Sequence, residues 1–168
     1  EAAKEKPVIA SFSDLAAYFA FYGIGGEHLT GTGEPERLTG VPVSQNFFSL
    51  LGVQPVVGRP FTDEECRWNG PRAVLLSYGL WERRFNSDPG IVGRKIPLNG
   101  ANCTVIGVMP LGFEFPLPLF NVQGGQFAER VDIWKPVAFT ENELKNRGSR
   151  DYSIVARLAP GITLQQAQ

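Results

Sequence analysis

Apolar and polar residues alternate over short stretches of this chain and rarely repeat at helical spacing over long ones. Short runs rich in β-branched and aromatic residues, separated by Gly, Pro, Asn and Asp, are typical of strands. We therefore predict a series of strands joined by turns and a few short helices. The predicted strands are residues 8–24, Arg37–Val43, Ala73–Leu76, Lys95–Leu98, Cys103–Val108, Val131–Val137 and Asp151–Leu158.

Two stretches are predicted to be hairpins. In residues 15–43, the turn is the segment Thr30–Gly33. In residues 95–108, Asn99-Gly100 is the turn, because both residue types tolerate the positive φ of a type I′ turn. Alternation on the second arm of this hairpin places Thr104, Ile106 and Val108 on one face, with Cys103, Val105 and Gly107 on the other.

Short helices are predicted where a capping residue precedes apolar residues at helical spacing. Ser44 is expected to cap a helix containing Phe47, Phe48 and Leu51 that ends at Gly52. Ser77 is expected to cap a helix over Tyr78–Phe85, with Trp81 partly exposed and a stop at Asp88-Pro89-Gly90. Capping boxes are predicted at Thr62–Glu65 and Thr163–Gln166, and a helical turn followed by a loop in residues 141–150.

Composition is that of a globular chain without a nucleic-acid partner. Its 168 residues, 43% hydrophobic with 12 Phe and 3 Trp, suit one domain or two small lobes, and 19 Gly and 13 Pro suit many turns. A net charge of -1 argues against nucleic-acid binding, and the small basic groups at Arg83-Arg84 and Lys145–Arg150 are interpreted as solvated faces.

Two features bear on membranes and export. The longest apolar run, Leu15–Ile24, is shorter than the roughly 20 residues of a membrane-spanning helix. The first residues, EAAKEKP, lack the pattern of a signal peptide. The capping box at Thr163 lies so close to the last residue that we expect the helix to continue in a longer parent protein.

Reactive side chains do not form a convincing active site. Two residues after Ser77 is Gly79, but two residues before it is Leu75 instead of glycine, so only half of the nucleophile-elbow pattern G-x-S-x-G is present. A hydrolase triad would also need a histidine base, and His28 is the only histidine. The consecutive carboxylates Asp63, Glu64 and Glu65 could be metal ligands or an acid/base pair. We interpret them instead as charges that stabilise the positive N-terminal end of a helix dipole. Gly23-x-Gly25-Gly26 is not followed by a helix pattern, as a phosphate loop requires. Cys66 and Cys103 are either free thiols or a disulfide. We predict no catalytic, cofactor-binding or metal-binding residue.

The segment Phe113–Phe120, FEFPLPLF, is the candidate interaction surface. An exposed apolar patch of this kind meets a partner or substrate, whereas the alternative is a loop folded back on the core. We predict that changing Leu117 and Leu119 to Ser leaves folding intact and weakens partner binding; a large loss of thermal stability would favour the alternative. The candidate residues are Phe113, Phe115, Leu117, Leu119 and Phe120.

A series of motifs covering roughly residues 33–168 resembles a known family. It resembles the extracytoplasmic core domain of MacB-type ABC transporter permeases, most closely the acidobacterial variety. The motifs, in chain order, are Val43-Ser44-x-x-Phe47-Phe48, Gly58-Arg59-x-Phe61, Leu80-Trp81-x-Arg83-Arg84-Phe85, Asp88-Pro89, Val92-Gly93, Leu98-Asn99-Gly100, Val105–Pro110 and Val155-Ala156-Arg157-Leu158-x-Pro160-Gly161-x-Thr163.

This resemblance implies an α+β fold of two lobes with short helices and several hairpins. A porter-like α/β lobe would comprise residues 1–36 and 138–168, incomplete because its first β-α unit is absent. An inserted, mixed β-rich lobe would comprise residues 37–137. Residues 117–130 are longer and more irregular than in MacB, so adaptor contacts made there do not transfer to this chain.

The resemblance also implies a location and a role. The domain would lie on the periplasmic side of the inner membrane, between transmembrane helices of its own permease, with a separate ATPase subunit and a periplasmic adaptor as partners. It would relay conformational change during export or lipoprotein and envelope transport, without a cofactor and without catalysis. The alternative is a ligand-binding module that recognises a lipid, peptide or sugar in a cleft between the lobes.

Overall fold

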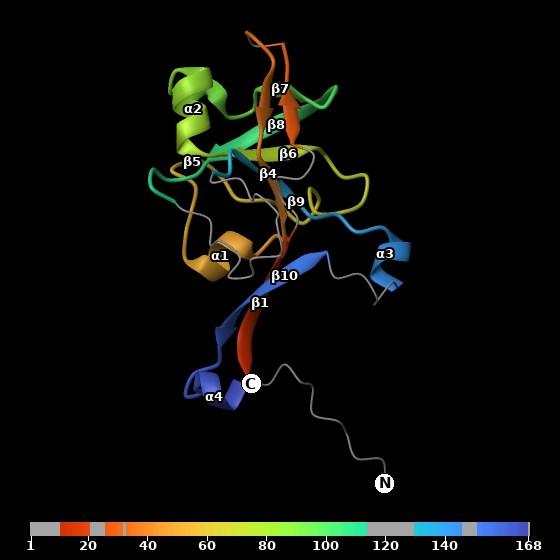
Figure 1. Cartoon of the computed structure of the whole chain (residues 1–168), viewed down its shortest axis with the longest axis vertical. Helices are drawn as coiled ribbons and strands as arrows, with labels where there is room; N and C mark the ends of the chain where they lie inside the picture. Colours follow the sequence, from red (N-terminus) through yellow and green to blue (C-terminus); the bar gives the residue numbers. More distant parts are fainter. Residues whose placement is uncertain (1–10, 21–25, 32, 114–129, 146–150, 168) are drawn as a thin grey trace, which may run out of the picture.

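Ten strands form one mixed sheet that carries a few short helices, which confirms the predicted α+β class. The structure is a computed structural model that describes residues 11–20, 26–31, 33–113, 130–145 and 151–167. The strand order is β10-β1-β4-β9-β6-β8-β7-β2-β3, and β5 pairs with β8 (Figure 1). The strands are β1 (Phe12–Phe19), β2 (Glu27–Leu29), β3 (Glu36–Leu38), β4 (Gly40–Val43), β5 (Val57–Gly58), β6 (Ala73–Leu76), β7 (Lys95–Leu98), β8 (Ala101–Val108), β9 (Ile133–Pro136) and β10 (Tyr152–Leu158).

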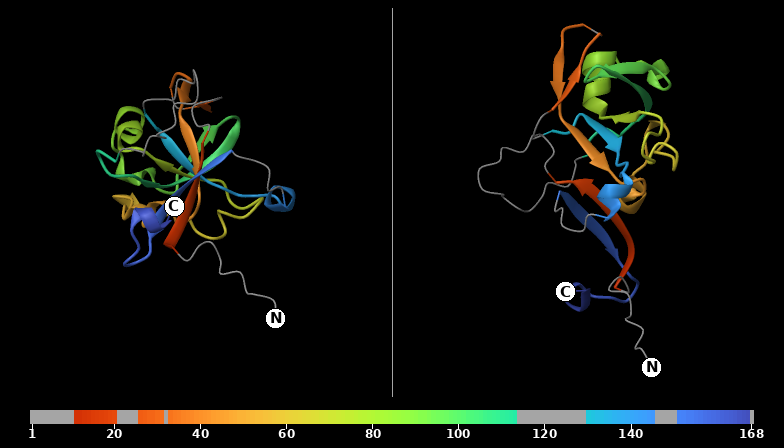
Figure 2. Two further views of the ribbon diagram at one scale, coloured as in Figure 1. Left: turned by 60° about the horizontal axis from the view of Figure 1, so that its bottom comes forward. Right: turned by 90° about the vertical axis from the view of Figure 1, so that its right-hand side faces the viewer.

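The helices are short and lie around this sheet. They are α1 (Phe47–Leu51), α2 (Tyr78–Phe85), α3 (Glu141–Lys145) and α4 (Leu164–Ala167), with a 3-10 turn at Pro89–Ile91. The molecule is elongated: α2, β7 and β8 lie at one end, and the pair β1 and β10 projects from the other (Figures 1 and 2). We call β1 and β10 the ribbon, and the remaining strands with α1 and α2 the body.

Strand β6, a predicted strand, lies at the centre of the body and is buried along its whole length. Its side chains alternate between two apolar clusters, Ala73 and Leu75 in the first, Val74 and Leu76 in the second. The first cluster also contains α1 and the inner side of β1, and the second contains α2, β7 and β2. The sheet therefore has a separate core on each side of β6.

The predicted hairpin over residues 15–43 is confirmed in part: β2 and β3 pair antiparallel on either side of the predicted turn, and β1 is an antiparallel neighbour of β4. β1 pairs with β10 and meets β4 only through Tyr18 and Val43, while β2 and β3 form the actual hairpin. The predicted strand Arg37–Val43 is broken at Thr39, whose backbone N–H donates to the Asp132 side chain and whose carbonyl accepts from the Asp132 and Ile133 amides. At this break the pairing partner of the chain changes: β3 pairs with β2, whereas β4 pairs with β9.

The β7–β8 hairpin is confirmed, with φ of 50° at Asn99 and 77° at Gly100. The predicted alternation along β8 fails at its end. The register with β6 shifts at Ile106, which adds one residue to β8. As a result Val108 joins the second cluster with Cys103 and Val105, while Ile106 lies in the first.

The helix caps are confirmed in one case and corrected in another. The Ser77 hydroxyl accepts a 3.1 Å hydrogen bond from the Leu80 amide, as expected of an N-cap. Trp81 is buried in the second cluster rather than partly exposed, and its Nε1–H donates to the Asp88 carbonyl at 2.8 Å, which satisfies the indole N–H. Ser44 does not cap α1: Asn46 holds the cap position, and the Ser44 hydroxyl accepts from the Ala17 amide instead.

The division into lobes stays a prediction. Strand β2, assigned to the flanking segment 1–36, pairs with β7 through Leu29 and Leu98.

Both predicted capping boxes have their reciprocal hydrogen bonds, although Thr62–Glu65 forms turns rather than a helix.

Candidate functional site

The part of the chain that the structure describes shows no assembled catalytic centre. It contains no group of three or more His, Cys, Asp or Glu side chains able to hold a metal ion. The Ser77 hydroxyl is engaged as a helix cap, and His28 is exposed on β2. Within the same residues, no helix is long and apolar enough to cross a membrane.

The first notable site is the junction between the ribbon and the body. Ser44 lies between β4 and α1; its amide donates to the Ala17 carbonyl at 2.8 Å and its hydroxyl accepts from the Ala17 amide at 2.9 Å. Asn46 Nδ2 donates to Asp14 Oδ1 and to the Leu15 carbonyl, both at 2.8 Å. We call these residues, Asp14, Leu15, Ala17, Ser44 and Asn46, the junction.

Helix α1 reinforces the junction from the body side. The Tyr18 ring on β1 packs edge-on against Phe47, with centroids 6.0 Å apart. From β10, the Arg157 guanidinium donates to the Leu50 carbonyl at the end of α1. Both strands of the ribbon are therefore held by the same short helix.

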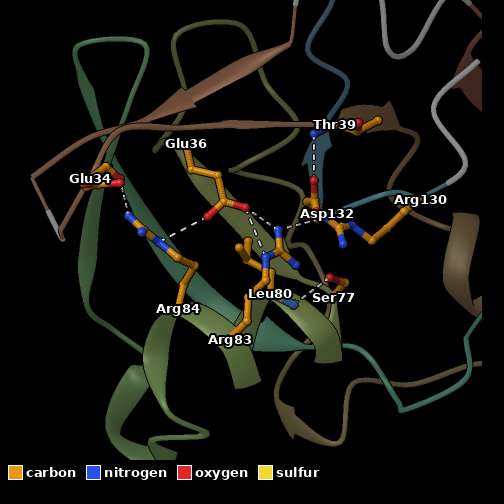
Figure 3. A network of polar contacts seen from close by, with 9 residues as sticks. All are labelled: Glu34, Glu36, Thr39, Ser77, Leu80, Arg83, Arg84, Arg130 and Asp132. Atoms are coloured by element: carbon orange, nitrogen blue, oxygen red, sulfur yellow. Dashed lines mark hydrogen bonds and ion pairs between the residues drawn. The ribbon is translucent and has the colours of Figure 1, made fainter.

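A second site is a network of charged groups around Asp132, shown in Figure 3. Asp132 is only 3% exposed, and its carboxylate accepts from the Thr39 amide at 3.0 Å and from Arg83 Nη2 at 2.8 Å. Arg130 Nε lies 2.9 Å from the same carboxylate. Two guanidinium groups thus compensate one buried negative charge.

Arg83 extends this network to β3. Its Nε and Nη2 donate to Glu36 Oε1 at 3.1 and 2.7 Å, and Arg84 pairs with Glu36 Oε2 at 3.3 Å. Burial acts against the charge on Arg83, but the bonds to Glu36 and Asp132 outweigh it and raise the pKa of its guanidinium. Arg83 and Arg84 are thus ion-paired and partly buried, not solvated as predicted. The network joins α2, β3 and the start of β9.

Phe113 is the one residue of the candidate interaction surface that the structure describes. Its ring centroid lies 5.8 Å from that of Phe48 and 5.6 Å from that of Trp134, so it packs partly buried against the first cluster. Phe115, Leu117, Leu119 and Phe120 lie outside the described residues. The interaction surface as a whole stays a prediction.

The two cysteines are free thiols. Cys66 packs against the first cluster and Cys103 belongs to the second. Burial, followed by the charges of Glu65 and Asp63, raises the pKa of Cys66 to about 11. Burial also raises the pKa of Cys103. Neither thiol has the lowered pKa of a reactive cysteine.

A cavity of about 510 Å³ opens on the body, and the sequence reasoning missed it. Trp68, which is 59% exposed, stands at its wall. Glu27 and Lys135 form an ion pair in its lining, and Asn99 Nδ2 donates to Glu27 at 2.6 Å. An isolated tryptophan in a polar, glycine-containing loop was the available signal, but its neighbours in the cavity come from distant strands.

Three solved structures share this fold. The extracellular domain of the noncanonic ABC-type transporter YknZ from Gram-positive bacteria has a TM-score of 0.63 and 18% identity, over 95% of this chain and 72% of that one. A domain of a putative permease from Porphyromonas gingivalis has a TM-score of 0.63 and 17% identity, over 95% and 63%. The periplasmic region of MacB from Actinobacillus actinomycetemcomitans has a TM-score of 0.60 and 13% identity, over 96% and 82%.

Family membership rests on the sequence itself. No curated protein matches the chain. The profile of the MacB-like periplasmic core domain, however, matches residues 2–168, nearly its whole length. Two of these solved structures are the extracellular domain of an ABC-type transporter and the periplasmic region of MacB. The chain therefore belongs to the family of MacB-like periplasmic core domains, the periplasmic part of ABC transporter permeases.

Proposed function

We propose that this domain works mechanically: it relays conformational change between the membrane helices of its permease and a substrate or partner in the periplasm. Relay of this kind requires a stiff connection from the membrane to the body, and two packed arrangements of the moving part. It requires no catalytic residue in the domain, and we propose that the domain carries out no catalysis.

The observation that carries the proposal is the pairing of β1 with β10. Seven residue pairs, from Phe12 with Leu158 to Phe19 with Tyr152, join the first and last described strands. Strands of this length span about 25 Å at 3.3 Å per residue. If membrane helices flank the domain on both sides, both strands of the ribbon lead toward the membrane, and the two flanks move as one element.

The junction supports transmission from the ribbon to the body. A two-stranded ribbon is only marginally stable alone, so its position depends on what it packs against. Here the bonds from Ser44 and Asn46 hold β1, and the body continues from β4 through parallel pairing with β9. Movement of the ribbon would thus reach α1 and β4 before the rest of the sheet.

The partners follow from this role. A separate ATPase subunit would supply the energy through the parent permease, and a periplasmic adaptor would contact the body. The surface Phe113–Phe120 is the proposed contact region, tested by the Leu117 and Leu119 substitutions to Ser. The alternative function, a module for a lipid, peptide or sugar, predicts a rise in melting temperature when that ligand is added.

The test uses the complete permease with its ATPase in membranes. Hydrogen exchange of β1, β10 and α1 is measured by mass spectrometry without nucleotide and with ATP plus vanadate. We expect nucleotide-dependent exchange in the ribbon and in α1. In the double variant Ser44→Ala and Asn46→Ala, the change should remain in the ribbon and disappear from α1.

The matched control is Asn102→Ala, an exposed residue on β8 away from the junction. This variant should show the same nucleotide dependence as the wild type. Identical exchange in all nucleotide states throughout the domain would contradict a mechanical role.

A further inference from the structure

Trp68 has a large apolar side chain that is exposed to solvent, and the loop that carries it is conformationally constrained. Its exposed fraction is 59%, whereas Trp81 and Trp134 are 8% and 1% exposed. Large apolar side chains kept in water at defined positions are typical of binding surfaces. The question is therefore what holds Trp68 in place and what surrounds it.

An ion pair closes the base of the loop, residues 59–73. Arg59 Nη1 and Nη2 lie 3.0 and 2.7 Å from the two carboxylate oxygens of Glu65, a bidentate arrangement. Glu65 Oε2 also accepts from the Thr62 amide at 2.9 Å. Phe61 and Glu65 are buried, so the loop is anchored on its inner side while Arg67 and Trp68 face outward.

The backbone next to Trp68 is equally constrained. Asn69 has a positive φ of 63°, and the Gly70 amide donates to the Arg67 carbonyl at 2.9 Å. A Cβ atom on Gly70 would lie 2.1 Å from the Glu64 carbonyl oxygen, so only glycine fits there. Trp68 is thus displayed on a rigid turn, which lowers the conformational entropy lost on binding.

Part of the wall of the cavity beside Trp68 is apolar. Pro42, Pro71, Pro136 and Tyr152 line it together with Trp68. Its volume of about 510 Å³ lies in the range of small-molecule sites, roughly 300–1,000 Å³. A ring or a short apolar chain could lie against these side chains.

The charged groups in the lining leave a positive excess. Glu27 is paired with Lys135, and Glu65 is paired with Arg59. Arg67 and Arg72 also line the cavity, and neither has an acidic partner among residues 11–20, 26–31, 33–113, 130–145 and 151–167. Guanidinium groups bind carboxylates and phosphates through paired N–H donors.

We infer that this cavity binds a small organic anion, in which a carboxylate or phosphate group on Arg67 and Arg72 is joined to a ring or apolar chain on Trp68. This site goes beyond the mechanical role. Tyr152 belongs to β10, whereas Pro42 and Pro136 belong to β4 and β9, so the lining of the cavity includes both the ribbon and the body.

The test follows the three indole N–H signals of the 168-residue chain by ¹H–¹⁵N NMR, with Trp68 assigned from Trp68→Phe. The probes are 2-naphthoate, 2-naphthyl phosphate and the neutral 2-naphthamide. We expect either anion to shift the Trp68 signal saturably, without comparable shifts of Trp81 and Trp134. Whichever of the two anions binds with the lower Kd identifies the charged group of the ligand as a carboxylate or a phosphate. 2-Naphthamide should bind at least about tenfold more weakly, which is the value of one charge-assisted hydrogen bond.

Substitutions in the lining and in the loop distinguish a loss of ligand binding from a loss of folding. Arg67→Ala and Arg72→Ala should each weaken anion binding about tenfold with an unchanged melting temperature. Gly70→Ala should weaken binding by distorting the loop, although it removes no lining side chain. The matched control is Gly79→Ala, where a Cβ meets no atom within 4 Å, and it should bind as the wild type does.

The inference is overturned if neither anion shifts the Trp68 signal saturably, or if 2-naphthamide binds as tightly as 2-naphthoate. Unchanged affinity in both arginine variants would also overturn it. These results concern the isolated domain, so they leave the nucleotide-dependent exchange experiment on the complete permease unaffected.

Discussion

Arg83 Nη2 lies 2.8 Å from Asp132 Oδ1, and this contact joins α2 to the residue that precedes β9. Asp132 also accepts from the Thr39 amide at the break between β3 and β4. One buried carboxylate therefore organises three segments that are far apart in the sequence. It fixes the point at which the chain leaves β3 and enters the parallel pair β4–β9.

We expect Asp132→Ala to lower the free energy of unfolding by about 2–3 kcal/mol. The substitution leaves the Thr39 amide without its acceptor and Arg83 without one of its partners. This loss of unfolding free energy should be smaller than the loss from breaking a fully buried ion pair, because the guanidinium groups of Arg83 and Arg130 can be rehydrated. Urea unfolding measures it.

Arg130→Ala provides the comparison within the same network. The Arg130 side chain is 62% exposed, so its pair with Asp132 should contribute less than about 1 kcal/mol. Equal losses in the Asp132 and Arg130 variants would contradict the assignment of Asp132 as the organising group.

Asn46→Ala should destabilise the junction by about 1–2 kcal/mol. It removes the hydrogen bonds to Asp14 and to the Leu15 carbonyl, each with a net value near 1 kcal/mol. A double-mutant cycle with Asp14→Ala should give a coupling energy of about 0.5–1 kcal/mol. Additive effects of the two substitutions, measured by chemical denaturation, would mean that the side chains do not interact.

Gly58→Ala should be among the most damaging single substitutions in the chain, with a loss above about 3 kcal/mol. Gly58 has a φ of 82°, and a Cβ there would lie 2.1 Å from the Ile106 carbonyl oxygen on β8. Thermal unfolding of Gly58→Ala and of the unobstructed control Gly79→Ala tests this. Wild-type stability in Gly58→Ala would show that β5 and β8 are not packed this closely.

Stability should fall in acid partly through Glu65. Burial acts to raise the pKa of its carboxyl, but the bonds from Arg59 and Thr62 outweigh burial, so the pKa lies below its ordinary value. A carboxylate with a lowered pKa in the folded state stabilises the fold above about pH 4.5, and this contribution is lost as the pH falls through the lowered pKa.

Glu65→Gln should therefore be less stable than the wild type at pH 7, by about 1–3 kcal/mol, and the difference should shrink below pH 4.5. Urea unfolding from pH 3 to pH 7 measures both effects, with the exposed neighbour Glu64→Gln as the control. A difference between Glu65→Gln and wild type that does not change with pH would rule out this role.

Cys66 and Cys103 should react much faster with a thiol reagent in the unfolded protein than in the native protein. With a pKa of about 11, Cys66 holds almost no thiolate at pH 7, and Cys103 is buried with a raised pKa. Ellman's reagent should react slowly with the native protein and titrate 2 thiols in urea. Rapid reaction of the native protein, or a loss of thiols under mild oxidation, would contradict the structure.

Much of the local structure could be predicted because its signals are local. Asn99-Gly100 determines the β7–β8 turn, since few other residues accept two consecutive positive φ angles. Ser77 before an apolar helix predicts its own hydrogen bond to Leu80. The motifs between Val43 and Pro110 were sufficient to predict the family, which the match over residues 2–168 confirms.

The sequence by itself thus determined most of the strands, the Asn99-Gly100 turn, the Ser77 cap and the family of this protein, while the tertiary structure decided which strands pair and which side chains meet. Alternation along β1 is the same whether its partner is β4 or β10, so nothing local identifies Leu158 as the partner of Phe12. The bulge at Ile106, the ion pair of Arg83 with Asp132 and the cavity beside Trp68 likewise arise from residues brought together by folding. Each depends on distances in space, which the order of residues along the chain does not contain.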